Sequence, residues 1–259
     1  GHQSLLRRSS HRSHADHRLL TLTDRGGADK ASPRSCLQLT SQIEGMIPMN
    51  LTSQTTRSLL SNLSLETFGF SRVAVVLTGS AGTQVMPYWL DWAQSAAPQT
   101  EFRVIMRKSA YQFITRHNIE SRLRTRIQED RWQEEIIASH IELGEWADLM
   151  LIYPATLGYS SKLARGLADS PSLVAALSTR ATVCVAPSLP PRSKENPIIE
   201  ETLRLLREPD NFVVFDPVPG PSESSDIDHA WIPPTFPDVL RQLERRRAAL
   251  ETQTSPRTA

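Results

Sequence analysis

Short, nearly unbroken apolar runs, each followed by a small-residue or proline-containing turn, constrain the fold of this chain more than any other feature. The clearest are Arg72–Leu77, Leu149–Tyr153 and Ala181–Ala186. Such runs are typical of strands buried on both faces, and their alternation with helical segments indicates a parallel sheet. We therefore expect an α/β fold, a three-layer doubly wound parallel sheet of the Rossmann or flavodoxin-like type, over residues 70–248.

The other segments complete this alternation. Two further strands are expected, at Glu101–Met106 and Asn211–Phe215. Helices are predicted for Thr83–Ala97, Ser109–Ile114, the segment that follows His140 and ends near Trp146, a segment from about Ser160, Asn196–Arg207 and Phe236–Ala249. Irregular structure is predicted for Arg122–Trp132, a turn at His140, Pro154–Gly158, the proline-rich stretch Pro187–Arg192 and Gly220–Asp228.

The two ends of the chain differ from this middle part. Residues 1–50 are rich in Ser, Arg, His and Gly without an apolar period, which predicts a disordered basic tail. A short helical lead-in is predicted for residues 51–69, and a disordered tail for residues 249–259. The early histidines are interpreted as part of a solvated basic tail rather than as metal ligands, so no metal is expected there. Those histidines are His2, His11, His14 and His17.

Charge and cysteine content exclude several classes of protein. The formal net charge is +1, which favours neither nucleic acid nor an anionic membrane as a partner. The two cysteines, Cys36 and Cys184, are too few for a metal cluster or a disulfide framework, and Cys184 is predicted to be an inert buried thiol. No apolar run approaches membrane-spanning length, and no apolar h-region follows Arg7-Arg8, so a signal peptide is not expected. A cytoplasmic protein is expected.

Two turns are candidates for a ligand site. Thr78-Gly79-Ser80-Ala81-Gly82 lies between a strand and a helix, where small residues let a phosphate reach backbone N–H groups, although glycine can also serve only to turn the chain. The sequence contains neither GxGxxG nor GxxxxGK[ST]. Pro154–Gly158 similarly precedes a helix, and His140 lies one helix upstream. His140 can act as a base or merely cap a helix, and Ser109 can be an N-cap or a ligand contact.

A longer succession of residues resembles a known family over roughly Val73–Leu206. It consists of His140-Ile141, a helix, an apolar strand, Pro154-Ala155-Thr156, and the segment Lys162–Asp169. These residues are similar to the active-site histidine, the flavin loop and the following helix of the homo-oligomeric flavin-containing cysteine decarboxylases. This family includes phosphopantothenoylcysteine decarboxylase and the peptidyl-cysteine decarboxylases of lanthipeptide biosynthesis.

The resemblance implies a cofactor, site residues and partners. The implied cofactor is FMN, bound at a subunit interface of a homotrimer or dodecamer, and the implied catalytic residue is His140. Substrate contacts are implied for Leu189, Pro190 and Arg192, although Arg192 can equally be a solvated loop residue. The residues implied to bind FMN are Thr78, Gly79, Ser80, Ala81, Ser109, Phe113, Pro154, Ala155, Thr156 and Gly158. Trp89, Trp92, Trp132 and Trp146 are expected in the core or at subunit contacts rather than against flavin.

The activity expected from the resemblance is oxidative decarboxylation of the C-terminal cysteine of a ribosomally made precursor peptide to an aminoenethiol. In the implied route, hydride passes from the cysteine Cβ to FMN before CO2 leaves. Two positions depart from the family: Gly158 stands where the family has Asn, and Pro187–Lys194 keeps only the Pro of the clamp PxMNxxMW. The alternatives are phosphopantothenoylcysteine decarboxylase, which the missing clamp disfavours, flavin prenyl transfer, and a non-catalytic or regulatory flavoprotein.

Overall fold

The computed structural model describes residues 65, 68–123, 126–132, 139–220 and 230–254. All of them belong to the second of two compact units, Thr55–Ala259. The predicted tail at 1–50, with its four histidines and Cys36, lies outside the described residues. Most of the predicted lead-in, including residues 51–64, also lies outside them.

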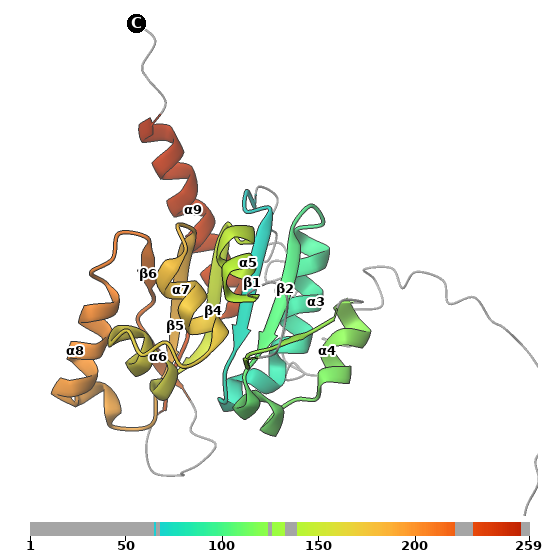
Figure 1. Ribbon diagram of the computed structural model, residues 1–259. Helices are drawn as coiled ribbons and strands as arrows, with labels where there is room; N and C mark the ends of the chain where they lie inside the picture. Colours follow the sequence, from blue (N-terminus) through green and yellow to red (C-terminus); the bar gives the residue numbers. More distant parts are fainter. Residues whose placement is uncertain (1–64, 66–67, 124–125, 133–138, 221–229, 255–259) are drawn as a thin grey trace, which may run out of the picture. The chain divides into compact units, whose positions relative to one another are not determined.

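A six-stranded parallel sheet, in the order β3-β2-β1-β4-β5-β6, forms the centre of the molecule (Figure 1). This is the strand order of a doubly wound Rossmann-type sheet, which confirms the predicted α/β fold class. The strands are β1 (Arg72–Leu77), β2 (Glu101–Met106), β3 (Gln128–Glu129), β4 (Leu149–Thr156), β5 (Thr182–Ser188) and β6 (Phe212–Val214).

Helices cover both faces of this sheet and make three layers. In β1, Val73 and Val75 belong to one apolar core, whereas Ala74 and Val76 belong to the other, because successive side chains of a strand point to opposite faces. The first core is closed by α3 (Met86–Ala96), α4 (Arg116–Leu123) and α9 (Phe236–Thr254). The second is closed by α5 (Ser139–Trp146), α6 (Leu157–Ala164) and α7 (Pro171–Ser178).

A smaller region lies beyond β5. It contains a 3-10 turn, η3 (Ser193–Glu195), helix α8 (Pro197–Leu206) and an antiparallel ribbon of β7 (Val218–Gly220) and β8 (Ala230–Ile232). The predicted helix at Asn196–Arg207 is confirmed, with Pro197 in its first turn and the Asn196 side chain accepting the N–H of Ile198. This region places the end of β5 next to the ribbon.

The end of β4 differs from the prediction. Pro154 to Thr156 continue the strand, and α6 begins at Leu157, so the loop predicted for Pro154–Gly158 is wrong. Ala155 and Thr156 pair with Pro187 and Ser188, which therefore belong to β5 rather than to an irregular proline-rich loop. The Thr78 hydroxyl also accepts the N–H of Thr156, and this contact from 78 residues away supports the strand end.

The charged segment Arg122–Trp132 is not an irregular, solvated connection. Helix α4 extends to Leu123, and β3 pairs with the end of β2 as the edge strand of the sheet. Ile127 is buried in the core, and the carboxylate of Asp130 has no solvent exposure. Burial of these two side chains holds the segment against the sheet.

Two predicted helices begin differently. Residues Ala81–Val85 form a 3-10 turn, η1, and α3 starts only at Met86, because Pro87 with its fixed φ suits the first turn of an α-helix. Likewise η2 (Lys108–Gln112) is a short 3-10 turn, and Ser109 lies inside it rather than capping it. His140 lies in the first turn of α5 and not in a preceding turn.

The structure also extends beyond the predicted elements. Helix α9 continues to Thr254, past the predicted domain end, and its last turns carry the ion pair between Arg247 and Glu251. Helix α7, which the sequence analysis does not predict, starts at Pro171. Gly220 ends β7, and the rest of the loop predicted there, residues 221–229, lies outside the described residues.

Candidate functional site

The candidate site lies where β1 and β4 run side by side. The chain leaves β1 toward β2 on one side and leaves β4 toward β5 on the other, so this pair is the switch point of the strand order. Open α/β sheets bind ligands in the crevice outside the carboxyl ends of the strands at such a point. The turn Thr78–Gly82 follows the carboxyl end of β1, and the segment Pro154–Gly158 contains the carboxyl end of β4 and the start of α6.

Thr78 joins the two strand ends. Its hydroxyl donates to the carbonyl of Pro154 at 2.6 Å and accepts the N–H of Thr156 at 3.0 Å. Thr78 and Ala155 are fully buried, and Pro154 is buried as well. These three predicted FMN contacts are therefore enclosed by the protein's own packing, and they shape the crevice from below.

The turn after β1 is pressed against the turn after β2. A Cβ added to Gly79 would lie 2.5 Å from the Cβ of Ser109, which is closer than real Cβ atoms approach. Only glycine allows this contact, which brings two of the predicted FMN-binding turns together. Ser80 and Ala81 stay partly exposed above it, and Ser109 is exposed.

Ser188, at the end of β5, is a site residue that the sequence analysis did not select. Its hydroxyl lies 2.8 Å from the Ser80 hydroxyl, and its backbone pairs with Thr156. The placement follows from the register of β4 and β5, which the sequence does not reveal. The signal that could have indicated Ser188 is a hydroxyl side chain close to the end of the apolar run Ala181–Ala186.

The rim of the crevice carries apolar and open positions. Phe113, which ends η2, is 37 % exposed, and its ring is available to a ligand. Gly158, in the first turn of α6, has no atom within 4 Å of the place where a Cβ would lie. The position that departs from the resembled family thus borders open space.

The predicted substrate segment divides into a buried and an exposed part. Leu189 is 3 % exposed, packs against Ile199 and Leu203, and exchanges two backbone hydrogen bonds with Trp231 of β8. Its side chain therefore holds the segment in place and is closed to a substrate. Pro190 and Arg192 are exposed, and Arg192 has a left-handed φ of 61°.

His140 begins α5 at the same carboxyl edge of the sheet. Helix α5 leads into the amino end of β4, and its first turn therefore lies at the other end of that strand. The His140 ring contacts the Trp132 ring edge to face, with centroids 5.3 Å apart, and its Nδ1 is buried without a hydrogen-bond partner. Among the described residues, no hydrogen bond joins His140 to Thr78–Ala81 or Pro154–Gly158.

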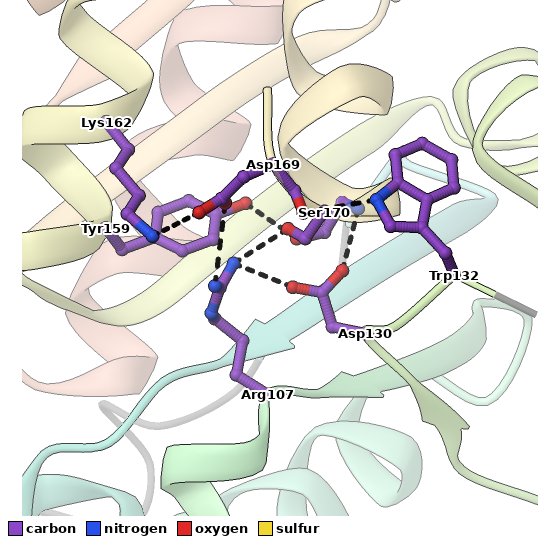
Figure 2. A network of polar contacts seen from close by, with 8 residues as sticks. Arg107, Asp130, Trp132, Tyr159, Lys162, Asp169 and Ser170 are labelled. Atoms are coloured by element: carbon purple, nitrogen blue, oxygen red, sulfur yellow. Dashed lines mark hydrogen bonds and ion pairs between the residues drawn. The ribbon is translucent and has the colours of Figure 1, made fainter. Parts of the chain in front are cut away.

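A network of polar contacts includes Trp132, whose ring contacts His140 (Figure 2). Arg107, at the end of β2, donates 2.8 Å hydrogen bonds to the carboxylate of Asp130 and the hydroxyl of Ser170. The other oxygen of Asp130 accepts the N–H of Ser172 in α7 at 2.8 Å. Asp169 pairs with Lys162, and its carbonyl accepts the indole N–H of Trp132. The network ties the edge of β2 and β3 to the start of α7.

The four tryptophans do not share one environment. Trp89 and Trp92 pack against the first core and Trp146 against the second, as expected of core residues. Trp132 is 53 % exposed and contacts His140, so it lies outside the core, and the other expected position, a subunit contact, stays a prediction for this residue. Cys184, in contrast, is fully buried as predicted, and burial raises the pKa of its thiol.

Two cavities of the structure lie around β6, at the opposite margin of the sheet from β3. The larger, about 330 Å³, is bordered by Arg207, Asp210 and Arg246, and the smaller, about 220 Å³, by ends of α6, α7 and α8. Neither is lined by a residue of the crevice. Within the described part of the chain, no group of three His, Cys, Asp or Glu could hold a metal, and no helix is long and apolar enough to cross a bilayer.

Residues 63–247 match the model of the family described as Flavoprotein. The chain belongs to the flavoprotein family. The predicted class of cofactor, a flavin, is thereby confirmed, and so is the resemblance to flavin-containing decarboxylases.

The relatives include two enzymes that match over most of their length. One is the cypemycin cysteine dehydrogenase (decarboxylating) of Streptomyces sp, which is 25 % identical over 187 residues, or 71 % of this chain and 96 % of that protein. The other is the phosphopantothenoylcysteine decarboxylase of Oryza sativa subsp. japonica, which is 26 % identical over 214 residues, or 78 % of this chain and 94 % of that protein.

Among solved structures, the FMN-dependent cysteine decarboxylase SpaF superposes with a TM-score of 0.57 at 22 % identity. The match covers 69 % of this chain and 97 % of that chain. At this identity the likeness shows a shared fold, in agreement with the strand order of the sheet.

The residues around the crevice suit a flavin mononucleotide. Hydroxyls of Ser80, Ser109 and Ser188 and the backbone of a glycine turn are suitable partners for a phosphate. The exposed Phe113 ring offers an apolar surface to a planar ring system. The Gly79–Ser109 contact further fixes the turn that would receive the phosphate, and the site therefore fits the group.

Proposed function

We propose that this protein is an FMN-dependent peptidyl-cysteine decarboxylase. Its substrate would be the C-terminal cysteine of a ribosomally made precursor peptide, and its product an aminoenethiol of a lanthipeptide-like pathway. The observation that carries the proposal is the meeting of the Gly79, Ser109 and Ser188 turns at the β1–β4 switch point. The cypemycin enzyme and SpaF, whose names state cysteine decarboxylation or dehydrogenation, support it.

Each predicted site residue has a place in this proposal. The turn Gly79–Ala81 and Ser109 would hold the phosphate, Thr156 and Gly158 would border the flavin, and Phe113 would pack on it. Thr78, Pro154 and Ala155 would act through the backbone that they support, because their side chains are buried. FMN would supply the acceptor for hydride from the cysteine Cβ.

The protein's own groups would handle the substrate and its protons. His140 would take the thiol proton or orient the carboxylate, since an imidazole can act as base or donor near neutral pH. Arg192, exposed on the segment after β5, would pair with the terminal carboxylate. Pro190 would border the peptide, and Leu189 would support the segment from inside.

Assembly and location belong to the same proposal. A homotrimer, or a dodecamer built from trimers, would place the FMN at a junction of subunits, where His140 of a neighbouring copy could face it. The protein would act in the cytoplasm, where a precursor peptide with a reduced cysteine is available.

The test measures cofactor and turnover on the purified full-length protein. We expect a flavin spectrum, FMN in the released ligand by mass spectrometry, and a loss of about 46 Da (CO2 and two hydrogens) from a Cys-terminated peptide. The same peptide ending in Ser is the control and should stay unchanged. Bound FMN without any mass change on cysteine substrates would contradict the proposal and favour the non-catalytic flavoprotein.

The second candidate is phosphopantothenoylcysteine decarboxylase, favoured by the match to 94 % of the rice enzyme. The same assay with phosphopantothenoylcysteine distinguishes the two. Faster turnover of phosphopantothenoylcysteine than of any Cys-terminated peptide would replace the peptide proposal by this one.

A further inference from the structure

The imidazole of His140 is in contact with the indole of Trp132. The two rings meet at an interplanar angle of 75° with ring centroids 5.3 Å apart. Functional histidines are commonly oriented by a hydrogen bond from the second ring nitrogen to a carbonyl or carboxylate. Here Nδ1 is buried and has no hydrogen-bond partner among the described residues. The contact with the Trp132 ring is therefore the restraint that we consider for the imidazole.

The indole is itself held in place. Its Nε1–H donates to the backbone carbonyl of Asp169 at 3.2 Å, at the start of the turn into α7 (Figure 2). The hydrogen bond leaves one face of Trp132 against His140 and more than half of the residue exposed. An exposed tryptophan with a fixed indole N–H is suited to support a neighbouring ring rather than to fill a core.

The backbone that carries Trp132 is anchored two residues earlier. The carboxylate of Asp130 has no exposure, and it binds the Arg107 guanidinium and the N–H of Ser172, each at 2.8 Å. This anchor ties the loop after β3 to both β2 and α7. A chain of fixed contacts therefore runs from the sheet to Asp130, from there to Trp132, and from Trp132 to the imidazole.

We propose that Trp132 is a positioning residue for His140. Held by the Asp169 carbonyl and by the Asp130 anchor, its indole fixes the plane of the imidazole and directs the ring toward the substrate. Trp132 would act through His140 without touching the substrate. The inference rests on the role proposed for His140 in decarboxylation, but the geometric part can be measured without turnover.

The experiment compares Trp132→Leu, which removes the ring contact, with Trp132→Phe, which keeps an aromatic face but loses the indole donor. Trp146→Leu is the matched control, because Trp146 lies at the other end of α5 against Arg103. The histidine side-chain NMR signals are recorded on the isotope-labelled flavin-loaded protein, and His140 is assigned by its disappearance in His140→Asn. FMN content, KM and kcat are measured in parallel.

We expect the three-bond couplings that report the His140 χ1 angle to change strongly in Trp132→Leu, less in Trp132→Phe, and not in Trp146→Leu; unlike chemical shifts, these couplings do not depend on the ring current of the deleted indole. In Trp132→Leu, kcat should fall about 10- to 100-fold with KM and FMN content unchanged, because misplacement of a reacting group costs rate rather than binding. Unchanged His140 χ1 couplings, or full kcat in Trp132→Leu, would overturn the inference. If the wild type turns over no cysteine substrate, the proposed function fails, and the χ1 couplings alone decide whether Trp132 orients His140.

Discussion

The hydroxyl of Thr78 accepts the backbone N–H of Thr156 and donates to the carbonyl of Pro154, so that one side chain joins the ends of β1 and β4. These are the two strands that border the crevice. The hydroxyl thereby replaces the strand-to-strand bonds that a proline-containing strand end cannot make, because proline has no N–H.

Replacing this hydroxyl should weaken the connection between the ends of β1 and β4 without creating a cavity. Thr78→Val keeps the shape of the buried side chain but leaves the Thr156 N–H and the Pro154 carbonyl unpaired. We expect the free energy of unfolding to fall by about 1–3 kcal/mol, because buried polar groups without partners are costly. The midpoint of urea denaturation and the absorbance of bound flavin would both decrease. Thr252→Val, on the exposed surface of α9, is the control and should change neither.

Two glycines of the site should respond in opposite ways to alanine. In Gly79→Ala the new Cβ meets Ser109 at 2.5 Å, so the two turns must separate and flavin affinity should drop at least about tenfold. Gly158→Ala meets nothing within 4 Å, lies in a helix, and should be neutral or stabilising by up to about 1 kcal/mol.

The double variant Gly79→Ala/Ser109→Gly separates steric from chemical effects. Removing the Ser109 side chain relieves the clash, and flavin titration should recover part of the lost affinity. Equal affinity of Gly79→Ala and wild type would contradict the close approach of the two turns.

The buried carboxylate of Asp130 should contribute strongly to stability. In Asp130→Asn the largely buried Arg107 loses its nearer charge partner and keeps only the longer contact with Asp169, and we expect the free energy of unfolding to fall by about 3 kcal/mol. Equilibrium urea unfolding would report this as a lower midpoint with an unchanged slope. Glu201→Gln removes one partner of the exposed pair with Arg204 and should leave the midpoint where it was. Equal midpoints for the two variants would mean that Asp130 is not buried in solution.

Alkaline pH should destabilise the fold. Burial raises the pKa values of Cys184, Tyr153 and Tyr159 above their ordinary values of 9.0 and 10.0. The neutral forms therefore persist in the folded state while the unfolded chain ionises. Their contribution to stability is complete below about pH 9 and is lost progressively as the pH rises further. Chemical denaturation at pH 8 and pH 10.5 would show it, and equal stabilities would contradict it.

The burial of Cys184 also predicts that its thiol reacts slowly in the folded protein. Cys184 should resist alkylation at pH 8 in the folded protein and react after unfolding, because the thiolate is the nucleophile. Peptide mapping after iodoacetamide treatment would locate the modified residue. Labelling of Cys184 in the native protein would show that β5 opens readily.

Much of the sheet follows from local composition, because strands buried on both faces read as apolar runs. Arg72–Leu77 and Glu101–Met106 were predicted with the bounds that the structure has. The edge strand β3 was not, since it consists of Gln128 and Glu129 and pairs on one side only. The end of β4 was also missed, because it depends on a hydroxyl 78 residues away in the chain.

The candidate site divides in the same way. Gly79, Ser80 and Ser109 follow strand ends and Thr156 ends β4, and the strand ends of a parallel sheet meet at one edge, so the sequence predicts that these residues are neighbours. Ser188 enters through the register of β4 and β5, and Trp132 through long-range hydrogen bonds, and neither register nor such bonds can be read from local pattern. The burial of Leu189 could not be predicted for the same reason, because it depends on the position of Trp231 in the β7–β8 ribbon.

The open space above Gly158 makes this position a natural place for evolutionary variation. A side chain introduced there would extend outward without displacing any neighbour, so substitution by different polar residues should leave the fold unchanged. Enzymes that share this scaffold could thus diverge in the molecules they accept by changing one helix-start residue. In this protein the absence of a side chain at Gly158 leaves the space at the start of α6 open.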